Sequence, residues 1–218
     1  MRTLFLAGLC FLSMSAAAGD MGEKVHDYFD NKLYLGANGG WGSTTWKGLV
    51  PNLDNQNIVI SISTPTDVFE GGGVYGGFLG YEINPQFAIE ANYLKYPSAS
   101  IFFDPNSLFS FETDGRTILN TQTEAVSLMA KFMIAIPNTP IRAYSSVGGG
   151  GIHRTDELND VWLGTPAFGV GVNVPVSKHF MMEIAGNYMA GYGESELNPV
   201  QDFIPFLYSI YFRVGLRL

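Results

Sequence analysis

The chain has 218 residues, a formal net charge of −8 and only 15 % charged residues, compared with roughly 25 % in ordinary soluble domains. Its acidic balance argues against nucleic acid as a partner, because binding to a phosphate backbone requires a basic surface. Glycine (26 residues) and aromatic residues (14 %) are abundant, which suits a β protein either in water or in a membrane.

Residues 1–18 have the three parts of a secretory signal peptide. Arg2 gives the positive start, an apolar run follows, and the alanines at 16–18 fit a cleavage site. The apolar run is too short for a spanning helix; a buried N-terminal helix is the alternative interpretation. We predict that the mature chain begins with a short polar lead, 19–31. Because Cys10 lies inside the signal, the mature chain would contain no cysteine.

Alternation of apolar and polar residues with period two predicts eight strands. Each is close to the ~9–11 residues that a tilted strand needs to cross a bilayer. The predicted strands are 32–41, 73–83, 87–96, 123–134, 141–152, 165–174, 180–190 and 206–218. The last strand alternates most regularly, with apolar or aromatic residues at Tyr208, Ile210, Phe212, Val214, Leu216 and Leu218.

The connections between these strands alternate in length. Three are short and rich in turn-forming residues: 84–86, 137–140 and 175–179. Four are long: 42–72, 97–122, 153–164 and 191–205. This alternation is typical of membrane barrels, in which short turns face the periplasm and long loops face outward. With no linker in the sequence, we expect 32–218 to form a single barrel domain.

The two faces of the predicted strands differ in polarity. A soluble barrel has its apolar face inside, whereas a membrane barrel has it outside. An apolar face over six strands would aggregate in water, so we predict an all-β, eight-stranded antiparallel up-and-down transmembrane barrel. Aromatic residues near the strand ends suggest interfacial belts, although strands favour aromatic residues in general: Trp41, Tyr93, Tyr188 and Tyr208 at the outer ends, and Tyr81, Phe87 and Phe132 at the inner ends.

This architecture resembles the small outer-membrane barrel superfamily, which includes the OmpA-like transmembrane domain and the surface-antigen group. The resemblance covers 30–218 and rests on the strand and loop pattern and on the terminal strand, 208–218. It implies a location in the outer membrane of a Gram-negative bacterium, contact with its lipid and lipopolysaccharide, and recognition by the barrel-assembly machinery. Members usually end in Phe, whereas this chain ends in Leu218. The superfamily is functionally mixed, so the resemblance implies no particular activity.

Six charged residues are predicted to face the barrel lumen: Glu82, Glu90, Lys131, Arg142, Glu183 and Arg213. They comprise three acids and three bases, and buried charges must be paired. The interior of an eight-stranded barrel is just wide enough for side chains to fill it. We therefore interpret these residues as a lumen ion-pair network that replaces a hydrophobic core, with a gate or proton path as the alternative.

Only one segment suggests catalysis. His153-Arg154-Thr155 is similar to the His-x-Ser element of membrane-embedded lipid A deacylases, with Asp156 or Glu157 as the carboxylate. Thr in place of Ser departs from that element, and a solvated loop histidine is the simpler interpretation. No other nucleophile motif and no metal-spaced histidine pair occurs in the sequence, so we expect a non-enzymatic protein without cofactor or metal.

The long loops are acidic, with only Lys47, Arg116 and Arg154 as bases. We expect a solvated crown that repels anionic lipopolysaccharide unless divalent cations bridge the two. The acids are Asp54, Asp67, Glu70, Asp104, Glu112, Asp114, Asp156, Glu157, Asp160, Glu194, Glu196 and Asp202.

Two loops contain apolar runs, 58–62, 101–103 and 108–111. We expect these runs to extend the strands above the membrane; adhesion to a host or partner protein and a mouth for small hydrophobic molecules are the alternatives. The sequence as a whole predicts a structural or surface-interaction, adhesin-like role. A narrow channel for small hydrophobic solutes and a lipid A-modifying hydrolase are the alternative functions.

Overall fold

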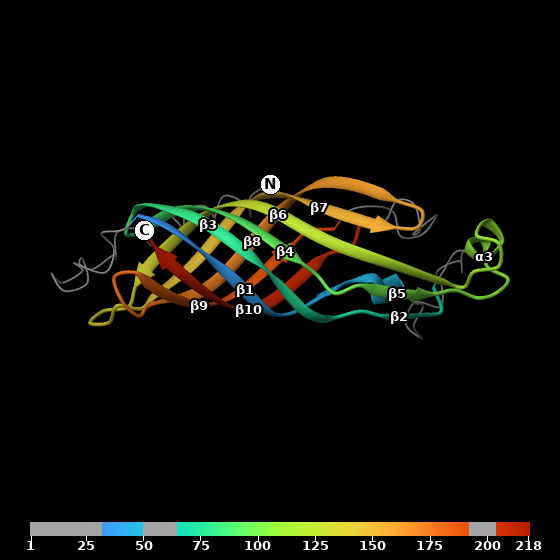
Figure 1. Ribbon diagram of the computed structural model, residues 1–218, viewed down its shortest axis with the longest axis horizontal. Coiled ribbons are helices and arrows are strands. Elements are labelled where there is room, and N and C mark those ends of the chain that lie inside the picture. The colour runs from blue at the N-terminus through green and yellow to red at the C-terminus, as the bar shows by residue number, and fades with distance from the viewer. Residues whose placement is uncertain (1–31, 50–64, 192–203) are drawn as a thin grey trace, which may run out of the picture.

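The computed structural model describes residues 32–49, 65–191 and 204–218 (Figure 1). The proposed signal peptide and polar lead lie outside these residues. Eight long strands form a closed antiparallel barrel, in which each strand pairs with its neighbours and β6 pairs with β7 to close the wall. The predicted fold class is confirmed. The barrel strands are β1 (Leu33–Thr44), β3 (Gly72–Asn84), β4 (Phe87–Lys95), β6 (Ile118–Ala135), β7 (Arg142–Asp156), β8 (Asp160–Pro175), β9 (Phe180–Met189) and β10 (Leu207–Arg217).

The three short connections are confirmed at one end of the barrel. Between β3 and β4, the backbone N–H of Gln86 donates to the Asn84 side chain at 2.9 Å. Between β6 and β7, Asn138 has a φ of 63°, a left-handed conformation that asparagine tolerates better than most residues. Between β8 and β9, the N–H of Val176 donates to the carbonyl of Phe180 at 2.9 Å. In barrels of this kind, short turns mark the periplasmic end.

The connection expected at 153–164 is not a long loop. β7 continues to Asp156 and β8 begins at Asp160, so the two strands form a long hairpin that extends beyond the barrel. The Asp156 carboxylate makes the turn, because its Oδ1 accepts the N–H groups of Leu158 at 3.0 Å and Asn159 at 2.8 Å. The backbone N–H groups of the turn therefore have hydrogen-bond acceptors within a short connection, and no longer loop is needed.

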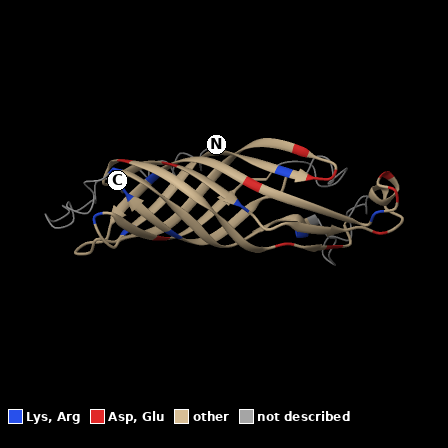
Figure 2. Ribbon diagram, viewed as in Figure 1, with Lys and Arg blue, Asp and Glu red and all other residues tan. Residues whose placement is uncertain are grey.

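The outward faces are apolar, as the alternation predicts. Every barrel strand exposes large hydrophobic side chains, among them Leu79, Leu128, Val170, Ile184 and Ile210. Charged positions are sparse along the barrel wall and acidic ones gather toward the end that carries α3 (Figure 2). Aromatic rings form pairs near the strand ends: Trp41 with Tyr208, Tyr188 with Phe206, and Phe87 with Phe132.

None of the described helices is long and apolar enough to cross a membrane.

A small extension rises from the loop end of the barrel (Figure 1). It contains the helical turn η2 (Trp46–Leu49), the strands β2 (Asp67–Phe69) and β5 (Ala99–Phe102), and the helix α3 (Leu108–Glu112). β5 pairs with the first residues of β6 and with β2. The extension has its own hydrophobic cluster: Trp46, Val68, Ala99, Ile101, Phe103, Phe109 and Leu119.

The apolar runs of the loops have different outcomes. The run at 101–103 extends the sheet through β5, as expected. The run at 108–111 forms α3 instead of a strand, because the Ser107 side chain accepts the N–H of Ser110 and caps a helix. The run at 58–62 lies outside the described residues.

Candidate functional site

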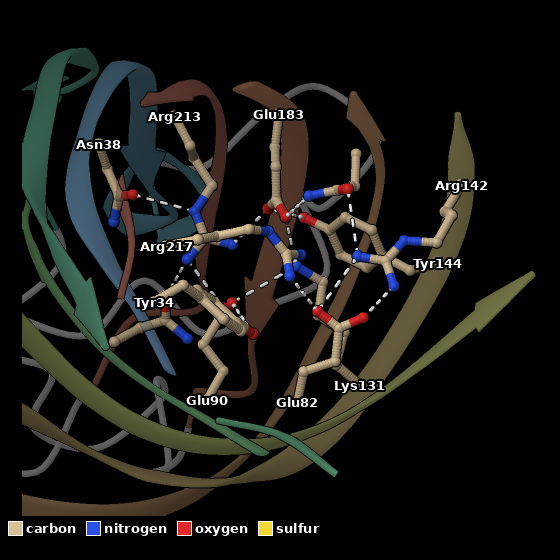
Figure 3. Close-up of polar contacts among 12 residues, drawn as sticks. Tyr34, Asn38, Glu82, Glu90, Lys131, Arg142, Tyr144, Glu183, Arg213 and Arg217 are labelled. Carbon is tan, nitrogen blue, oxygen red and sulfur yellow. Dashed lines mark hydrogen bonds and ion pairs between the residues drawn. The ribbon is translucent and has the colours of Figure 1, made fainter. Parts of the chain in front are cut away.

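The six lumen residues identified from the sequence are all buried inside the barrel. They come from β3, β4, β6, β7, β9 and β10, and Figure 3 shows them converging within the lumen. They form two groups, a central ring and a cluster toward the periplasmic turns.

The central ring consists of Glu90, Lys131, Glu183 and Arg213. Lys131 Nζ lies 3.4 Å from Glu90 Oε2 and 2.6 Å from Glu183 Oε1. Arg213 closes the ring, with its two terminal nitrogens each 2.8 Å from one of the same carboxylates. Each charge therefore has two opposite charges as neighbours and the ring is neutral overall. This arrangement offsets the large cost of removing four ions from water.

Polar neighbours complete the ring. The hydroxyl of Tyr34 donates to Glu90 at 3.0 Å, and that of Tyr144 donates to Glu183 at 3.1 Å. The Arg213 guanidinium donates to the side-chain oxygens of Asn38 at 3.1 Å and Asn92 at 3.0 Å. Aromatic faces cover the cations, since Lys131 lies 3.8 Å from the centre of the Tyr144 ring and Arg213 lies 3.7 Å from that of Phe78. Such cation–π contacts add to the attraction that holds both side chains in the ring.

The second cluster surrounds Glu82. Arg142 pairs with one carboxylate oxygen of Glu82, and Arg217 lies 2.7 Å from the other. Arg142 also donates to the carbonyl of Pro85 at 3.0 Å and to Asn173 Oδ1 at 3.3 Å. Because Asn173 Nδ2 donates to Glu183 at 2.7 Å, this amide joins the cluster to the central ring.

A buried arginine and a buried ion pair near the ends of the barrel were missing from the sequence-based network. Arg217 could have been included. It lies on β10 an even number of residues after Arg213, so its side chain points to the same face of the strand. The other is the pair of Arg154 and Asp156 (2.7 Å), whose side chains are fully buried beneath the Trp46 ring. Those residues were assigned to a loop, so no strand face could be given to them.

The network does not replace a hydrophobic core, contrary to the sequence-based interpretation. Apolar side chains fill the lumen on both sides of the ions, toward the periplasmic turns and toward the extension. They include Ala88, Met133 and Met181 at one end, and Val74, Leu94, Ile152, Met189 and Leu207 at the other. Along the barrel axis, the ion pairs of the network lie between these two apolar regions, where Glu and Asn side chains point into the lumen.

Glycine makes room for the inner tyrosines. A Cβ atom on Gly80 would lie 2.2 Å from Cζ of Tyr34, and one on Gly171 would lie 2.6 Å from Cζ of Tyr144. Each ring therefore lies directly on the backbone of a neighbouring strand. The positions of both hydroxyls in the ion-pair ring depend on these two glycines.

His153 lies on strand β7 rather than in a loop. Its ring stacks on Trp162 with 4.5 Å between centroids, and Nε2 lies 2.7 Å from Asp160 Oδ1 and 3.2 Å from Thr155 Oγ1. A proton relay needs the carboxylate and the hydroxyl on opposite ring nitrogens, whereas here both contact the same one. The carboxylates expected as its partners bind arginines instead: Asp156 and Glu157.

Several acidic residues of the expected crown have structural partners. Glu70 accepts the N–H of Trp46 at 2.8 Å and so holds η2, and Asp104 accepts the N–H of Asn106 at 2.8 Å in the turn before α3. Asp156 and Glu157 pair with arginines, so these four are not free solvated carboxylates. The remaining acids of the loops include residues outside the described part of the chain: Asp54, Glu194, Glu196 and Asp202.

The extension also exposes hydrophobic side chains to solvent. Phe69 on β2 is 67 % exposed, and its ring meets that of Phe102 edge to face, with 5.7 Å between centroids. Phe111 on α3 is 86 % exposed, and Leu108 and Ile118 are also exposed. We call these five residues the aromatic surface. Such apolar groups above a membrane are unusual unless they bind a partner.

The barrel wall is continuous in the described residues. β4 pairs with β6 over the whole of β4, and β6 pairs with β7 from Thr121 to Ala135. An apolar groove of about 630 Å³ crosses β3, β4, β6 and β7 next to Tyr93. Its floor contains the small outward residues Gly77, Ala91 and Gly149. Because the strands beneath it remain hydrogen-bonded, the groove lies on the wall and does not open a path through it.

No group of three or more His, Cys, Asp or Glu residues that could hold a metal ion occurs within 32–49, 65–191 and 204–218.

A closed barrel with an apolar exterior, an interior packed with ion pairs and apolar side chains, and an extension at its loop end defines a small transmembrane barrel. The chain belongs to the outer membrane protein beta-barrel domain family, whose family model matches residues 4–203. No curated protein matches the sequence. The family points to the outer membrane of Gram-negative bacteria; cleavage after residue 18 stays a prediction.

Solved structures share the fold at low sequence identity. Neisserial surface protein A is 12 % identical, with a TM-score of 0.54 over 85 % of this chain and 97 % of that one. The N-terminal barrel domain of Pseudomonas aeruginosa OprF is 13 % identical, with a TM-score of 0.50 over 86 % and 98 %. OprG of the same organism is 13 % identical, with a TM-score of 0.50 over 86 % and 97 %. At this identity, the likeness shows the fold alone.

Proposed function

We propose that this protein is a non-conducting, non-enzymatic barrel that binds a protein partner at the cell surface through its aromatic surface. The observation that carries the proposal is the extension itself. It has a hydrophobic cluster separate from that of the barrel, so it is held in a defined shape above the membrane. A rigid support with exposed aromatic anchors is the usual design of a protein-binding surface.

The charges around the aromatic surface favour a basic partner. Asp67 is the pairing neighbour of Phe102 across β2 and β5, and Glu112 and Asp114 are exposed beside Phe111. The nearest base along the chain, Arg116, already pairs with Glu157. Complementary charge would speed the encounter and orient the partner, so we expect a partner with apolar anchors surrounded by Lys and Arg.

A synthetic peptide of alternating Leu and Lys serves as a probe of this chemistry. It would be titrated against the full chain in phosphatidylcholine vesicles, which carry no net charge of their own. We expect saturable binding that weakens at least tenfold in F69S and in F111S. The matched control is V176S, because Val176 is also an exposed apolar residue but lies in a turn at the opposite end of the barrel. Equal binding by all variants, or no binding at all, would contradict the proposal.

The packed lumen supports the non-conducting part of the proposal. The ion-pair ring spans the interior between strands β4, β6, β9 and β10 (Figure 3), and apolar side chains fill the levels above and below it. In planar bilayers we expect no discrete current steps in salt solution. In loaded vesicles we expect no faster release of a small hydrophobic dye than from protein-free vesicles. Steady single-channel steps or accelerated release would favour the narrow channel instead.

A further inference from the structure

The apolar groove on the barrel wall crosses two successive rows of outward side chains on β3, β4, β6 and β7. The row nearer the periplasmic turns is Leu79, Ala91, Leu128 and Gly149, and the row nearer the loop end is Gly77, Tyr93, Val126 and Gly151. Each row combines large apolar residues with small ones. The groove therefore lies between the larger side chains, with the small residues as its floor.

The next outward row toward the loop end is polar. Its members are Tyr75, Lys95, Glu124 and His153. It lies about 7 Å from the nearer groove row, because a strand advances ~3.4 Å per residue. Lys95 Nζ lies 3.2 Å from Glu124 Oε1, and the two side chains are 30 % and 28 % exposed. Lys95 and Glu124 thus place a partly exposed ion pair at the loop end of the apolar groove.

This ion pair has one positive and one negative charge, which determines the headgroup that fits it. A phosphate next to Lys95 and an ammonium next to Glu124 would each form a charge-assisted hydrogen bond. The two phosphates of lipid A would meet a single base that already has a counter-ion, and Glu124 would repel them. A solute without a headgroup would make no use of the pair.

The groove suits an acyl chain. A chain that lies on Gly77, Ala91 and Gly149 also contacts the larger side chains on both sides, and each such contact adds dispersion attraction. A Cβ atom on Gly151 would lie 3.1 Å from the Trp162 ring, so this ring leans over the wall beside the groove. Tyr93 and Trp162 thus supply aromatic rings of the kind found at the level of lipid headgroups.

We propose that the groove binds one zwitterionic diacyl phospholipid, whose headgroup carries one phosphate and one ammonium group. An acyl chain lies in the groove, the phosphate contacts Lys95 and the ammonium contacts Glu124. This lipid site is on the barrel wall and the aromatic surface is on the extension. The two proposals are therefore independent, and F69S and F111S should retain the lipid.

The chain site is tested by counting retained lipids. Full chain in nanodiscs of equal parts phosphatidylethanolamine, phosphatidylglycerol and lipid A would be released into mild detergent and weighed by native mass spectrometry. We expect one retained phosphatidylethanolamine per chain. G149L should reduce this retention at least tenfold, because a Cβ there meets only the Thr165 carbonyl at 3.9 Å and leucine would extend into the groove.

The matched control is G186L. Gly186 lies on β9 outside the groove, and a Cβ there would meet its nearest atoms at 3.8 Å, so this variant should retain the lipid. Retention of lipid A or phosphatidylglycerol by the unaltered chain would overturn the proposal. So would a second copy of the chain in place of a lipid, no retained lipid at all, or equal retention by G149L and G186L.

The headgroup contact is tested by E124Q, which leaves the groove unchanged. Without the carboxylate, Lys95 has no counter-ion in the pair, so the anionic lipid gains and the ammonium loses its partner. We expect the ratio of retained phosphatidylethanolamine to phosphatidylglycerol to fall at least tenfold. E157Q is the control, since Glu157 also pairs with a base but lies in the hairpin turn, and it should leave the ratio unchanged. An unchanged ratio in E124Q would show that the ion pair does not select the lipid.

Discussion

Glu183 is the residue on which the lumen network depends most. Its two oxygens accept hydrogen bonds from Lys131, Arg213, Tyr144 and Asn173. Its side chain is fully buried, so no water can replace any of these donors. Removing one charge from a buried network leaves the opposite charges uncompensated, which costs more than the pair itself contributes.

We therefore expect E183Q to lose about 3–5 kcal/mol of unfolding free energy. Glutamine keeps the size of the side chain but leaves Lys131 and Arg213 to share the single carboxylate of Glu90. The matched control is E157Q, since Glu157 is also paired with an arginine but is half exposed; it should lose about 1 kcal/mol or less. Urea unfolding in phosphatidylcholine vesicles, followed by tryptophan fluorescence, measures both values, and equal losses would contradict the role of the ring.

A second prediction concerns the contact between Gly80 and the Tyr34 ring. G80A would force the ring away and lengthen its hydrogen bond to Glu90, so we expect a loss of about 1–3 kcal/mol. G39A is the control, because a Cβ there would meet no atom within 4 Å, and it should change stability by about 0.5 kcal/mol or less. The same urea titration distinguishes them, and a harmless G80A would show that Tyr34 has room to move.

At this scale, the sequence predicts which side chains face inward but not which of them meet. Alternation is sufficient to place Glu90, Lys131 and Arg213 on the polar face of their strands. Their pairing depends on the tilt and register of strands far apart in the sequence, since Glu90 and Arg213 are 123 positions apart. No pattern within a short stretch of sequence indicates that two residues so far apart in the chain are in contact.

Among the elements, the β7–β8 hairpin differs most from the sequence-based expectation. The turn holds because one oxygen of Asp156 binds the backbone of the turn and the other binds Arg154. Arg154 in turn lies 4.7 Å from the Trp46 ring centre. A single buried ion pair thus connects the hairpin to the cluster of the extension.

We expect D156A to loosen this hairpin while the barrel stays folded. The backbone N–H groups of Leu158 and Asn159 would lose their acceptor and Arg154 would lose its counter-ion, so amide hydrogen exchange over 153–162 should be at least tenfold faster. D160A is the control, because the Asp160 carboxylate binds the ring of His153 rather than the turn backbone and is largely exposed. If the two variants exchange at the same rate, the Asp156 turn does not hold the hairpin.

The sequence could not predict this hairpin, for a physical reason. Within the hydrocarbon, one face of a strand must be apolar, and alternation follows. Above the hydrocarbon, no face has to be apolar: the inner face carries the buried ion pair of Arg154 and Asp156. Thr155 and Asp160 can therefore be paired strand residues without an apolar–polar alternation around them. The terminal strand, which lies within the apolar band, could be delimited to within one residue at each end: 206–218 was predicted and Leu207–Arg217 is observed.

The whole molecule has two environments and a different source of stability in each. The barrel exposes apolar side chains such as Ile184 and Val170, each 62 % exposed, and these are stable only against lipid. The extension buries its apolar cluster as a soluble domain does. The boundary between them runs near the outer ends of the strands, where Lys95 and Glu124 form an ion pair of 3.2 Å.

This division predicts that the same substitution lowers the folding free energy by different amounts at different depths in the membrane. I184R places a charge near the middle of β9 on the lipid face, where arginine costs about 2–4 kcal/mol. V176R places the same charge in the turn that precedes β9, where water is available, and should cost about 1 kcal/mol or less. The folding free energies of the two variants in vesicles would test this. If I184R folded as well as V176R in vesicles, the apolar exterior would not face hydrocarbon, and the assignment of this barrel to a membrane would be wrong.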